Sequence, residues 1–376
     1  MQSTIKWWKF VAVFVFSLFL LPAVTQAQHY KQTNLVSDIM GMAPVHDPNL
    51  VNPWGLARSS GGPWWIGNNN SGTSTLYDGS GNPFPPPPNG PLVVTVPPPK
   101  GSPAGTQSTP TGVVFNGSPT DFLIAPGKSA VFIFATEDGT ISGWNPGVDV
   151  LNAKLMVDNS DNGGADGAVY KGATTAEMDG KRFLYVTNFR SGKVEVYNTN
   201  FKRVHLSEEA FDDEGIPRGF APFNVQNIGG SLFVTYAKQN GARHDDVAGD
   251  GNGFVRIFTP SGKHIGHLEH GPWLNSPWGA VWTTRDFGEF SNAILIGNFG
   301  SGKIAAFNGF THKFIGFVKN PDDSVLAING LWSLTFGNDG LAGPAKTLFF
   351  SAGIEDEHHG LFGTITPVDG LDGDEE

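Results

Sequence analysis

The chain of 376 residues has no cysteine, which excludes disulfide bonds, thiol catalysis and thiolate metal sites. Charged residues are scarce at 16%, and acids outnumber bases, so the formal net charge is −11. This acidic balance argues against nucleic acid or an anionic membrane surface as a partner. Long apolar runs are also missing beyond residue 27, so we expect no membrane span in the rest of the chain.

Glycine and proline are abundant instead, with 50 and 27 residues, and aromatic residues make up 12% of the chain. Turns need glycine and proline, and strands favour aromatic side chains. The mixture is typical of a turn-rich, all-β fold, and it argues against a disordered chain or a helical bundle.

The first residues have the features of a secretory signal peptide. Two lysines precede an apolar run from Phe10 to Leu21, and Thr25-Gln26-Ala27 provides small residues at a cleavage site. We therefore predict that residues 1–27 are a signal peptide and that the protein is secreted, periplasmic or on the cell surface. The alternative is a retained anchor, but the run is shorter than the ~20 residues that a spanning helix needs.

One pattern occurs six times, at intervals of 52 to 60 residues. Each copy opens with a triplet whose middle residue is Gly, Asn or Ser, as expected where backbones crowd together. The triplets are Trp54-Gly55-Leu56, Thr111-Gly112-Val113, Lys171-Gly172-Ala173, Phe223-Asn224-Val225, Trp278-Gly279-Ala280 and Trp332-Ser333-Leu334.

Every copy continues with a second and a third short run of β-branched or aromatic residues, and the first five copies close with a fourth. The sixth copy lacks this fourth strand, and an unpaired candidate lies near the N-terminus at Asn34–Ile39. We therefore predict a six-bladed β-propeller over residues 28–368, with four-stranded blades and the N-terminal strand completing the last blade. A row of β-sandwich domains is the alternative, but sandwiches lack a repeat of this length with one strand order.

The order proline-aromatic-glycine-aliphatic, strand, Asn-x-x-Ser-Gly, strand resembles the NHL class of six-bladed propellers. Several segments also resemble an uncharacterised family of exported proteins, some of which carry PEP-CTERM sorting tails. The segments are Asp47-Pro48-Asn49-Leu50-Val51-Asn52-Pro53-Trp54-Gly55, Gly219-Phe220-Ala221-Pro222-Phe223-Asn224, His244-Asp245-Asp246-Val247-Ala248-Gly249 and Gly360-Leu361-Phe362-Gly363.

The resemblance covers essentially the whole chain after the signal peptide, and it implies the fold and export but no established activity. The chain departs from the family at residues 369–376, which hold five acids and no sorting tail. We expect this acidic tail to be disordered.

Three turns between second and third strands begin the motif Asn-x-x-Ser-Gly, at Asn68, Asn188 and Asn298. In a propeller these turns share one face with the loops before the first strands, and function usually lies in such loops. An Asn side chain can close the turn by bonding to nearby backbone. The functional alternative is a set of amide carbonyls that faces a cation or a polar ligand.

Aromatic and basic residues of the same face are further candidates. Trp54, Trp278 and Trp332 stand at the entry to first strands, where they can pack between blades or offer flat faces to a sugar or an aromatic ligand. Arg190 and Arg218 lie in loops of this face, where they can bind a carboxylate in bidentate fashion or stay solvated.

Imidazole and carboxylate groups gather in two loops of this face. The candidate metal ligands are His244, Asp245 and Asp246 in blade four, and Glu355, Asp356, His358 and His359 in the blade-six run Glu355–His359. His with carboxylate suits Zn, Mn or Ni, and carboxylate with amide suits calcium. No metal-binding spacing motif accompanies them, so a solvated acidic rim is the alternative.

Two functions of different kinds fit these features, and whether the protein is an enzyme stays open. The first is an exported recognition module that binds a small polar molecule, a glycan or a protein through its loop face. The second is a hydrolase of the lactonase or esterase type, which would need calcium or another divalent metal at the axis. It rests on fold analogy, and most first strands carry no acid near their starts. We therefore favour recognition.

Overall fold

The computed structural model describes residues 29–161 and 166–368, so the predicted signal peptide and acidic tail lie outside the described residues. The described part is almost entirely β, with a single 3₁₀ turn, η1 (Gly288–Phe290), and no α-helix. None of its segments forms a helix with the length and apolar character that crossing a membrane requires.

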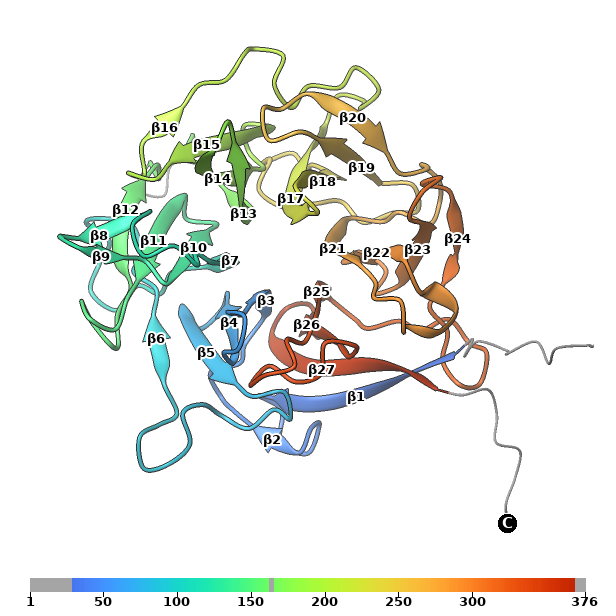
Figure 1. The fold of residues 1–376 in the computed structure, drawn as a ribbon, viewed down its shortest axis with the longest axis horizontal. Helices are drawn as coiled ribbons and strands as arrows, with labels where there is room; N and C mark the ends of the chain where they lie inside the picture. The colour runs from blue at the N-terminus through green and yellow to red at the C-terminus, as the bar shows by residue number, and fades with distance from the viewer. Residues whose placement is uncertain (1–28, 162–165, 369–376) are drawn as a thin grey trace, which may run out of the picture.

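Six sheets stand in a ring around one axis (Figure 1), which confirms the predicted six-bladed β-propeller. The first strand of each blade lies nearest the axis, and the later strands follow outwards. Blade one comprises β3 (Pro53–Ala57), β4 (Trp64–Asn68), β5 (Thr73–Tyr77) and β6 (Val93–Thr95). Blade two comprises β7 (Pro110–Phe115), β10 (Phe132–Thr136), β11 (Thr140–Trp144) and β12 (Lys154–Asp158), with a hairpin of β8 (Leu123–Ala125) and β9 (Lys128–Ser129) inserted.

The next three blades have the same strand order. Blade three comprises β13 (Tyr170–Met178), β14 (Lys181–Asn188), β15 (Lys193–Asn198) and β16 (Arg203–Val204). Blade four comprises β17 (Phe220–Ile228), β18 (Ser231–Lys238), β19 (Gly253–Phe258) and β20 (His264–His267). Blade five comprises β21 (Pro277–Trp282), β22 (Ala293–Asn298), β23 (Ile304–Asn308) and β24 (Phe314–Phe317).

Both ends of the described chain build the sixth blade. From the axis outwards it contains β25 (Leu331–Phe336), β26 (Leu348–Ile354), β27 (His359–Val368), β1 (His29–Ser37) and the short β2 (Val45–His46). Strand β1 pairs antiparallel with β27, so the N-terminal strand closes the ring as predicted.

The described part of the closing strand already starts at His29, five residues before the predicted Asn34–Ile39, and pairs with β27 from Val368 onwards. It ends at Ser37, whose hydroxyl donates to the Gly360 carbonyl and accepts the Ile39 N–H, turning the chain away. The repeat pattern therefore located the strand but not its extent.

Apolar side chains collect between neighbouring blades. One buried cluster fills each of the six interfaces, and a seventh lies at the axis. Burying each large apolar side chain contributes about 1.5–3 kcal/mol, so a chain without disulfides can be held by packing and strand pairing.

The small middle residues of the triplets lie where first strands of adjacent blades approach each other. A Cβ on Gly55 would stand 2.5 Å from the Thr111 carbonyl oxygen, and one on Gly112 would stand 2.6 Å from the Ala173 nitrogen. No real side chain fits at such distances, which confirms the expectation of crowded backbones at these positions.

Candidate functional site

A repeated backbone hydrogen bond builds the loop face. At the end of each second strand, one N–H is donated to the carbonyl of the residue just before the first strand of the same blade. The pairs are Asn69 to Asn52, Glu137 to Thr109, Phe189 to Val169, Gln239 to Gly219, Phe299 to Ser276 and Gly353 to Gly330, at 2.7–3.0 Å. Equivalent residues of the six blades therefore stand on one face around the axis.

Directly inside this face the axis is filled by aromatic side chains, which we call the axial floor: Trp54, Phe223, Trp278 and Trp332. The three tryptophans are 1–2% exposed. Trp54 stacks on Trp332 with ring centroids 3.5 Å apart, and Trp278 stands edge-on to both. They come from blades one, five and six and pack on one another across the axis.

The floor is also tied together by hydrogen bonds. The Trp332 indole donates to Asn52 Oδ1 at 3.0 Å, and the Trp278 indole donates to the Lys171 carbonyl at 2.9 Å. These bonds connect blade six with blade one and blade five with blade three. The floor is therefore a rigid base for the residues above it.

Those residues form the axial mouth, which we define as Asn52, Asn69, Glu137, Lys171, His244, Asp245 and Glu357. At its centre lies Lys171, the first residue of the third triplet, with a side chain that is 3% exposed. Its ammonium forms an ion pair with Glu137 and lies 3.6 Å from Asp245 Oδ1. Burial alone would lower the pKa of Lys171, but the charges of Glu137 and Asp245 outweigh it and raise that pKa.

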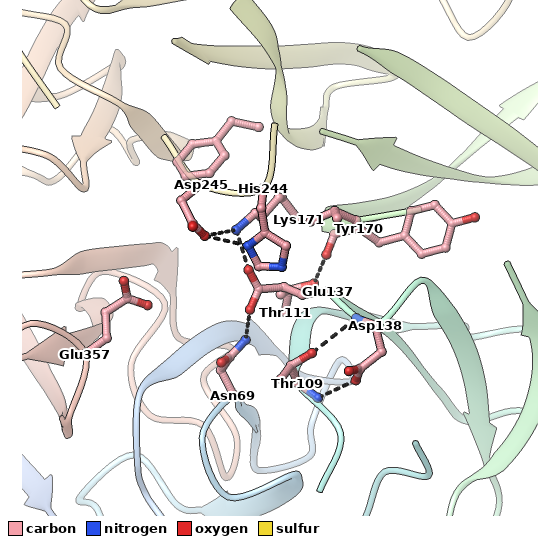
Figure 2. A network of polar contacts seen from close by, with 12 residues as sticks. Asn69, Thr109, Thr111, Glu137, Asp138, Tyr170, Lys171, His244, Asp245 and Glu357 are labelled. Atoms are coloured by element: carbon pink, nitrogen blue, oxygen red, sulfur yellow. Dashed lines mark hydrogen bonds and ion pairs between the residues drawn. The ribbon is translucent and has the colours of Figure 1, made fainter. Parts of the chain in front are cut away.

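Glu137 comes from the turn between β10 and β11 and reaches the mouth from blade two (Figure 2). One carboxylate oxygen pairs with Lys171, and the other accepts the Asn69 amide at 2.8 Å. Its neighbour Asp138 accepts the Thr109 N–H at 2.7 Å, while burial raises the pKa of Asp138. The ion pair with Lys171 and the hydrogen bond from Asn69 together hold both carboxylate oxygens of Glu137 in place.

His244 and Asp245 enter the mouth from the loop between β18 and β19 (Figure 2). His244 Nδ1 lies 2.7 Å from Asp245 Oδ1, so Nδ1 carries a hydrogen that the carboxylate accepts. This bond from His244, together with the charge of Lys171, outweighs burial and lowers the pKa of Asp245 to about 2. His244 also lines a cavity of about 260 Å³ with Glu137 and Arg190.

Glu357 reaches the mouth from blade six through an unusual turn. Glu355, Asp356 and Glu357 have φ values of 53°, 54° and 66°, in the left-handed region that costs non-glycine residues about 1–3 kcal/mol each. Glu357 accepts the Asn52 amide at 2.8 Å. Burial, with a smaller contribution from the charge of Glu137, raises the pKa of Glu357 to about 7. In Figure 2 it lies on the far side of the mouth from Asp138.

Of the metal ligands predicted from the sequence, the structure brings His244 and Asp245 together. With Glu137 they offer ligand atoms within 4.8 Å of one another, and no other such group occurs within residues 29–161 and 166–368. Asp246 is half-buried beside them, and burial raises its pKa. Histidine with two carboxylates is a donor set that suits zinc or manganese.

The four predicted ligands of blade six do not join this group. Glu355 and Asp356 are exposed, and His358 Nδ1 lies against the Glu355 carbonyl. His359 pairs instead with Asp38 at 2.8 Å. Only Glu357 of this run reaches the mouth, and the left-handed turn is what separates it from its neighbours.

The three motif asparagines are buried, and each has different hydrogen-bond partners. The Asn188 amide oxygen accepts the Ser191 N–H at 3.2 Å, and the Asn298 amide oxygen accepts the Asn275 N–H at 2.8 Å. The Asn68 amide donates to Thr75 at 3.0 Å. Arg190 donates to the Gly167 carbonyl at 2.8 Å, and Arg218 is exposed before β17. Asn188 thus bonds to the backbone of its own turn, Asn298 Oδ1 to the loop before β21, and Asn68 to a threonine side chain.

Sequence reasoning passed over Glu137 and Lys171, although the repeat marks both positions. Glu137 follows the second strand of its blade, as Asn69, Phe189 and Phe299 do in theirs. Lys171 opens its triplet, where the other five blades have Trp, Thr or Phe. A charged residue at a repeat position that is otherwise neutral was the available signal.

No family model matches the chain. Among solved structures, a protein of unknown function from Bacteroides thetaiotaomicron has 10% sequence identity and a TM-score of 0.50, and the alignment covers 90% of this chain and 76% of that one. A streptogramin B lyase has 11% identity and a TM-score of 0.49 over 91% of this chain and 99% of that one. At 10% identity, the similarity to the Bacteroides protein shows the fold alone.

One relative is much closer in sequence. The uncharacterized protein R648 of Acanthamoeba polyphaga mimivirus is 30% identical over 349 residues, which cover 89% of this chain and 80% of that protein. Identity of this level over nearly the whole ring means that the two chains share more than an architecture. The chain therefore belongs to the same family as the mimivirus protein R648.

Proposed function

We propose that this propeller is an exported recognition module that binds a small polar ligand at the axial mouth. The observation that carries the proposal is the convergence of Glu137, His244, Asp245 and Glu357 from three blades around Lys171, above a closed aromatic floor. Export rests on the signal peptide expected for residues 1–27.

The cavity beside the mouth suggests the size of the ligand. Its volume of about 260 Å³ lies just below the range of pockets for drug-sized molecules, so it suits a monosaccharide or an amino acid. Its lining includes the carboxylates of Glu137 and Asp138, the imidazole of His244 and the guanidinium of Arg190. Such a lining can bond to hydroxyl, amine and carboxylate groups.

The mouth is also organised before any ligand arrives. Lys171 and Asn69 fix Glu137, His244 fixes Asp245, and Asn52 fixes Glu357. Side chains that are already ordered lose little conformational entropy on binding, which favours affinity for a small ligand. This pre-organisation supports recognition as the role of the mouth.

Calorimetric titration and thermal shift of the chain with a panel of neutral sugars, amino sugars and amino acids test the proposal. We expect one class to bind and His244→Ala, which removes a side chain of the cavity lining, to weaken that binding by tenfold or more. Glu357→Gln should weaken it less, because Glu357 belongs to the mouth but does not line the cavity. His358→Ala is the matched control, because His358 lies in the same blade-six loop as Glu357 but outside the mouth. Binding that survives both mouth variants, or no binding across the panel, would refute small-ligand recognition at this place.

A metal-dependent hydrolase is the second candidate, favoured by the group Glu137, His244 and Asp245. A bound ion would polarise a carbonyl and acidify a water molecule there. Elemental analysis, the melting temperature before and after EDTA, and assays with lactones and aryl esters separate the two functions. Metal-free protein with an unchanged melting temperature and no turnover would remove the hydrolase.

A further inference from the structure

The oxygens that a metal ion would need in the axial mouth are already occupied. We propose that Lys171 is the resident cation of the mouth: its ammonium takes the place of a divalent metal between Glu137 and Asp245 and selects against such ions. The inference does not depend on which organic ligand the mouth binds.

The first step is the use of each donor atom. Glu137 gives one oxygen to Lys171 and the other to the Asn69 amide. Asp245 Oδ1 accepts from His244 Nδ1 and lies 3.6 Å from the Lys171 ammonium, while its Oδ2 accepts the Asn240 amide at 3.2 Å. Only His244 Nε2 is left without a bond. A metal would therefore have to displace protein contacts on both carboxylates.

The second step is that the ammonium is confined. Its nitrogen lies 5.1 Å from the Trp54 ring centroid and 5.9 Å from that of Phe189, both within the range of cation–π attraction. The Lys171 carbonyl is fixed by the Trp278 indole. The rings of Trp54 and Phe189 thus lie on one side of the Lys171 ammonium, and the carboxylates of Glu137 and Asp245 lie on the other.

The third step is charge. A divalent ion bound to Glu137 and Asp245 would stand next to the fixed positive charge of Lys171 and be repelled by it. The repulsion is strongest on the buried side, at Lys171 and Glu137, whereas water reaches the 60% exposed side chain of Asp245. A neutral side chain at position 171 removes that repulsion and leaves two carboxylates and one imidazole with ligand atoms within 4.8 Å. That donor set suits zinc or manganese.

The repeat supports the same conclusion independently. The residues equivalent to Lys171 in the other five blades are Trp54, Thr111, Phe223, Trp278 and Trp332, all neutral. Lys171 is therefore the single charge in this ring of six, and it lies beneath the described residues that could hold a metal. A residue that only filled space at position 171 could be neutral, as the equivalent residues are in the other five blades.

Titration of EDTA-treated protein with Zn²⁺, Mn²⁺ and Ca²⁺ tests the proposal. Lys171→Met keeps the length of the side chain and removes the charge. We expect weak binding to the wild type and at least tenfold tighter binding of Zn²⁺ or Mn²⁺ to Lys171→Met. Lys193→Met, which removes an exposed lysine of the same blade, should bind like the wild type.

A second variant shows where the metal binds. Lys171→Met with His244→Ala should lose the gained affinity, whereas a gain that persists contradicts the assigned site. If Lys171→Met does not fold, the wild-type titration decides: tight binding that His244→Ala abolishes overturns the proposal, and weak binding supports it. Because only metal ions are titrated, failure here is distinct from failure to find an organic ligand.

Discussion

The axial floor and the axial mouth lie next to each other on the axis of one ring, yet their side chains are of opposite character. The floor consists of buried aromatic rings, and the indoles of Trp278 and Trp332 have hydrogen-bond partners. Burial raises the pKa of Glu357 in the mouth and that of Asp246 beside it, and Glu357 is held in a left-handed turn. Stability is thus concentrated in the floor, whereas unfavourable charge and strain are retained in the mouth, as is common for functional sites.

Removing a floor residue should have the largest effect on stability. Trp332→Ala deletes a ring that stacks on Trp54 and Phe299, and it frees the Asn52 amide that holds Glu357. We expect a loss of about 3–5 kcal/mol in the free energy of unfolding, measured by urea denaturation. Phe310→Ala is the control, because this ring is 83% exposed and its loss should change little. A loss below about 1 kcal/mol for Trp332→Ala would mean that the floor does not stabilise the ring.

Breaking the ion pair between Lys171 and Glu137 should have the second-largest effect on stability. Glu137→Gln leaves the buried ammonium of Lys171 with Asp245 alone, 3.6 Å away, so we expect a loss of about 3 kcal/mol. The double variant Glu137→Gln with Lys171→Met has no unpaired charge and should regain much of that stability. A double-mutant cycle by urea denaturation measures the coupling, and strictly additive losses would show that the pair is not coupled.

The raised pKa of Glu357 predicts a smaller effect that depends on pH. An acid with a raised folded-state pKa binds its proton more tightly when folded, so its contribution to stability falls as pH rises from about 4.5 through about 7. Because the side chain is half-buried and partly screened, we expect a loss on the order of 1–2 kcal/mol.

Glu357→Gln can still accept the Asn52 amide but cannot ionise, so the variant should lack this decline. Its melting temperature should match that of the wild type near pH 5 and exceed it near pH 8. Melting curves measured across this range provide the comparison. If the melting temperatures of the two proteins changed in parallel with pH, ionisation of Glu357 would not destabilise the folded state.

Removing the His359 side chain, on the outer side of the blade-six loop, should have the smallest effect on stability. The hydrogen bond from His359 to Asp38, more than their attraction alone, raises the pKa of His359. Its contribution is therefore present at low pH and lost as pH rises through that pKa. His359→Ala should cost a few tenths of a kcal/mol near pH 5 and less near pH 8, because the ring is partly exposed. His358→Ala should be neutral at both values, and equal losses for the two variants would contradict the pairing with Asp38.

Much of the fold could be predicted from the sequence because its signals are local. The interval between triplets, the small residue in the middle of each and the missing sixth outer strand all follow from turn chemistry and strand patterning. The sequence predicted the closing strand from Asn34, whereas the described β1 already pairs with β27 from His29. Local patterns indicate which strands exist, whereas pairing with a strand far away in the sequence decides which residues join them.

The candidate site was much harder to predict, because its residues meet only across the axis. Glu137 and Asp245 come from different blades, and nothing near either residue in the sequence indicates that Lys171 lies between them. In the run Glu355–His359 four residues were predicted as metal ligands, but three successive left-handed residues direct the fifth, Glu357, to the mouth. That selection depends on backbone geometry, which the order of polar residues does not encode.

The sequence alone thus determined a closed ring of six blades, because the residues that make strands, turns and crowded contacts recur at a fixed interval. Tertiary structure alone decided which charges share the axis and which aromatic rings lie beneath them. The physical reason is that strand formation depends on neighbours along the chain, whereas an ion pair depends on distances in space that only ring closure establishes.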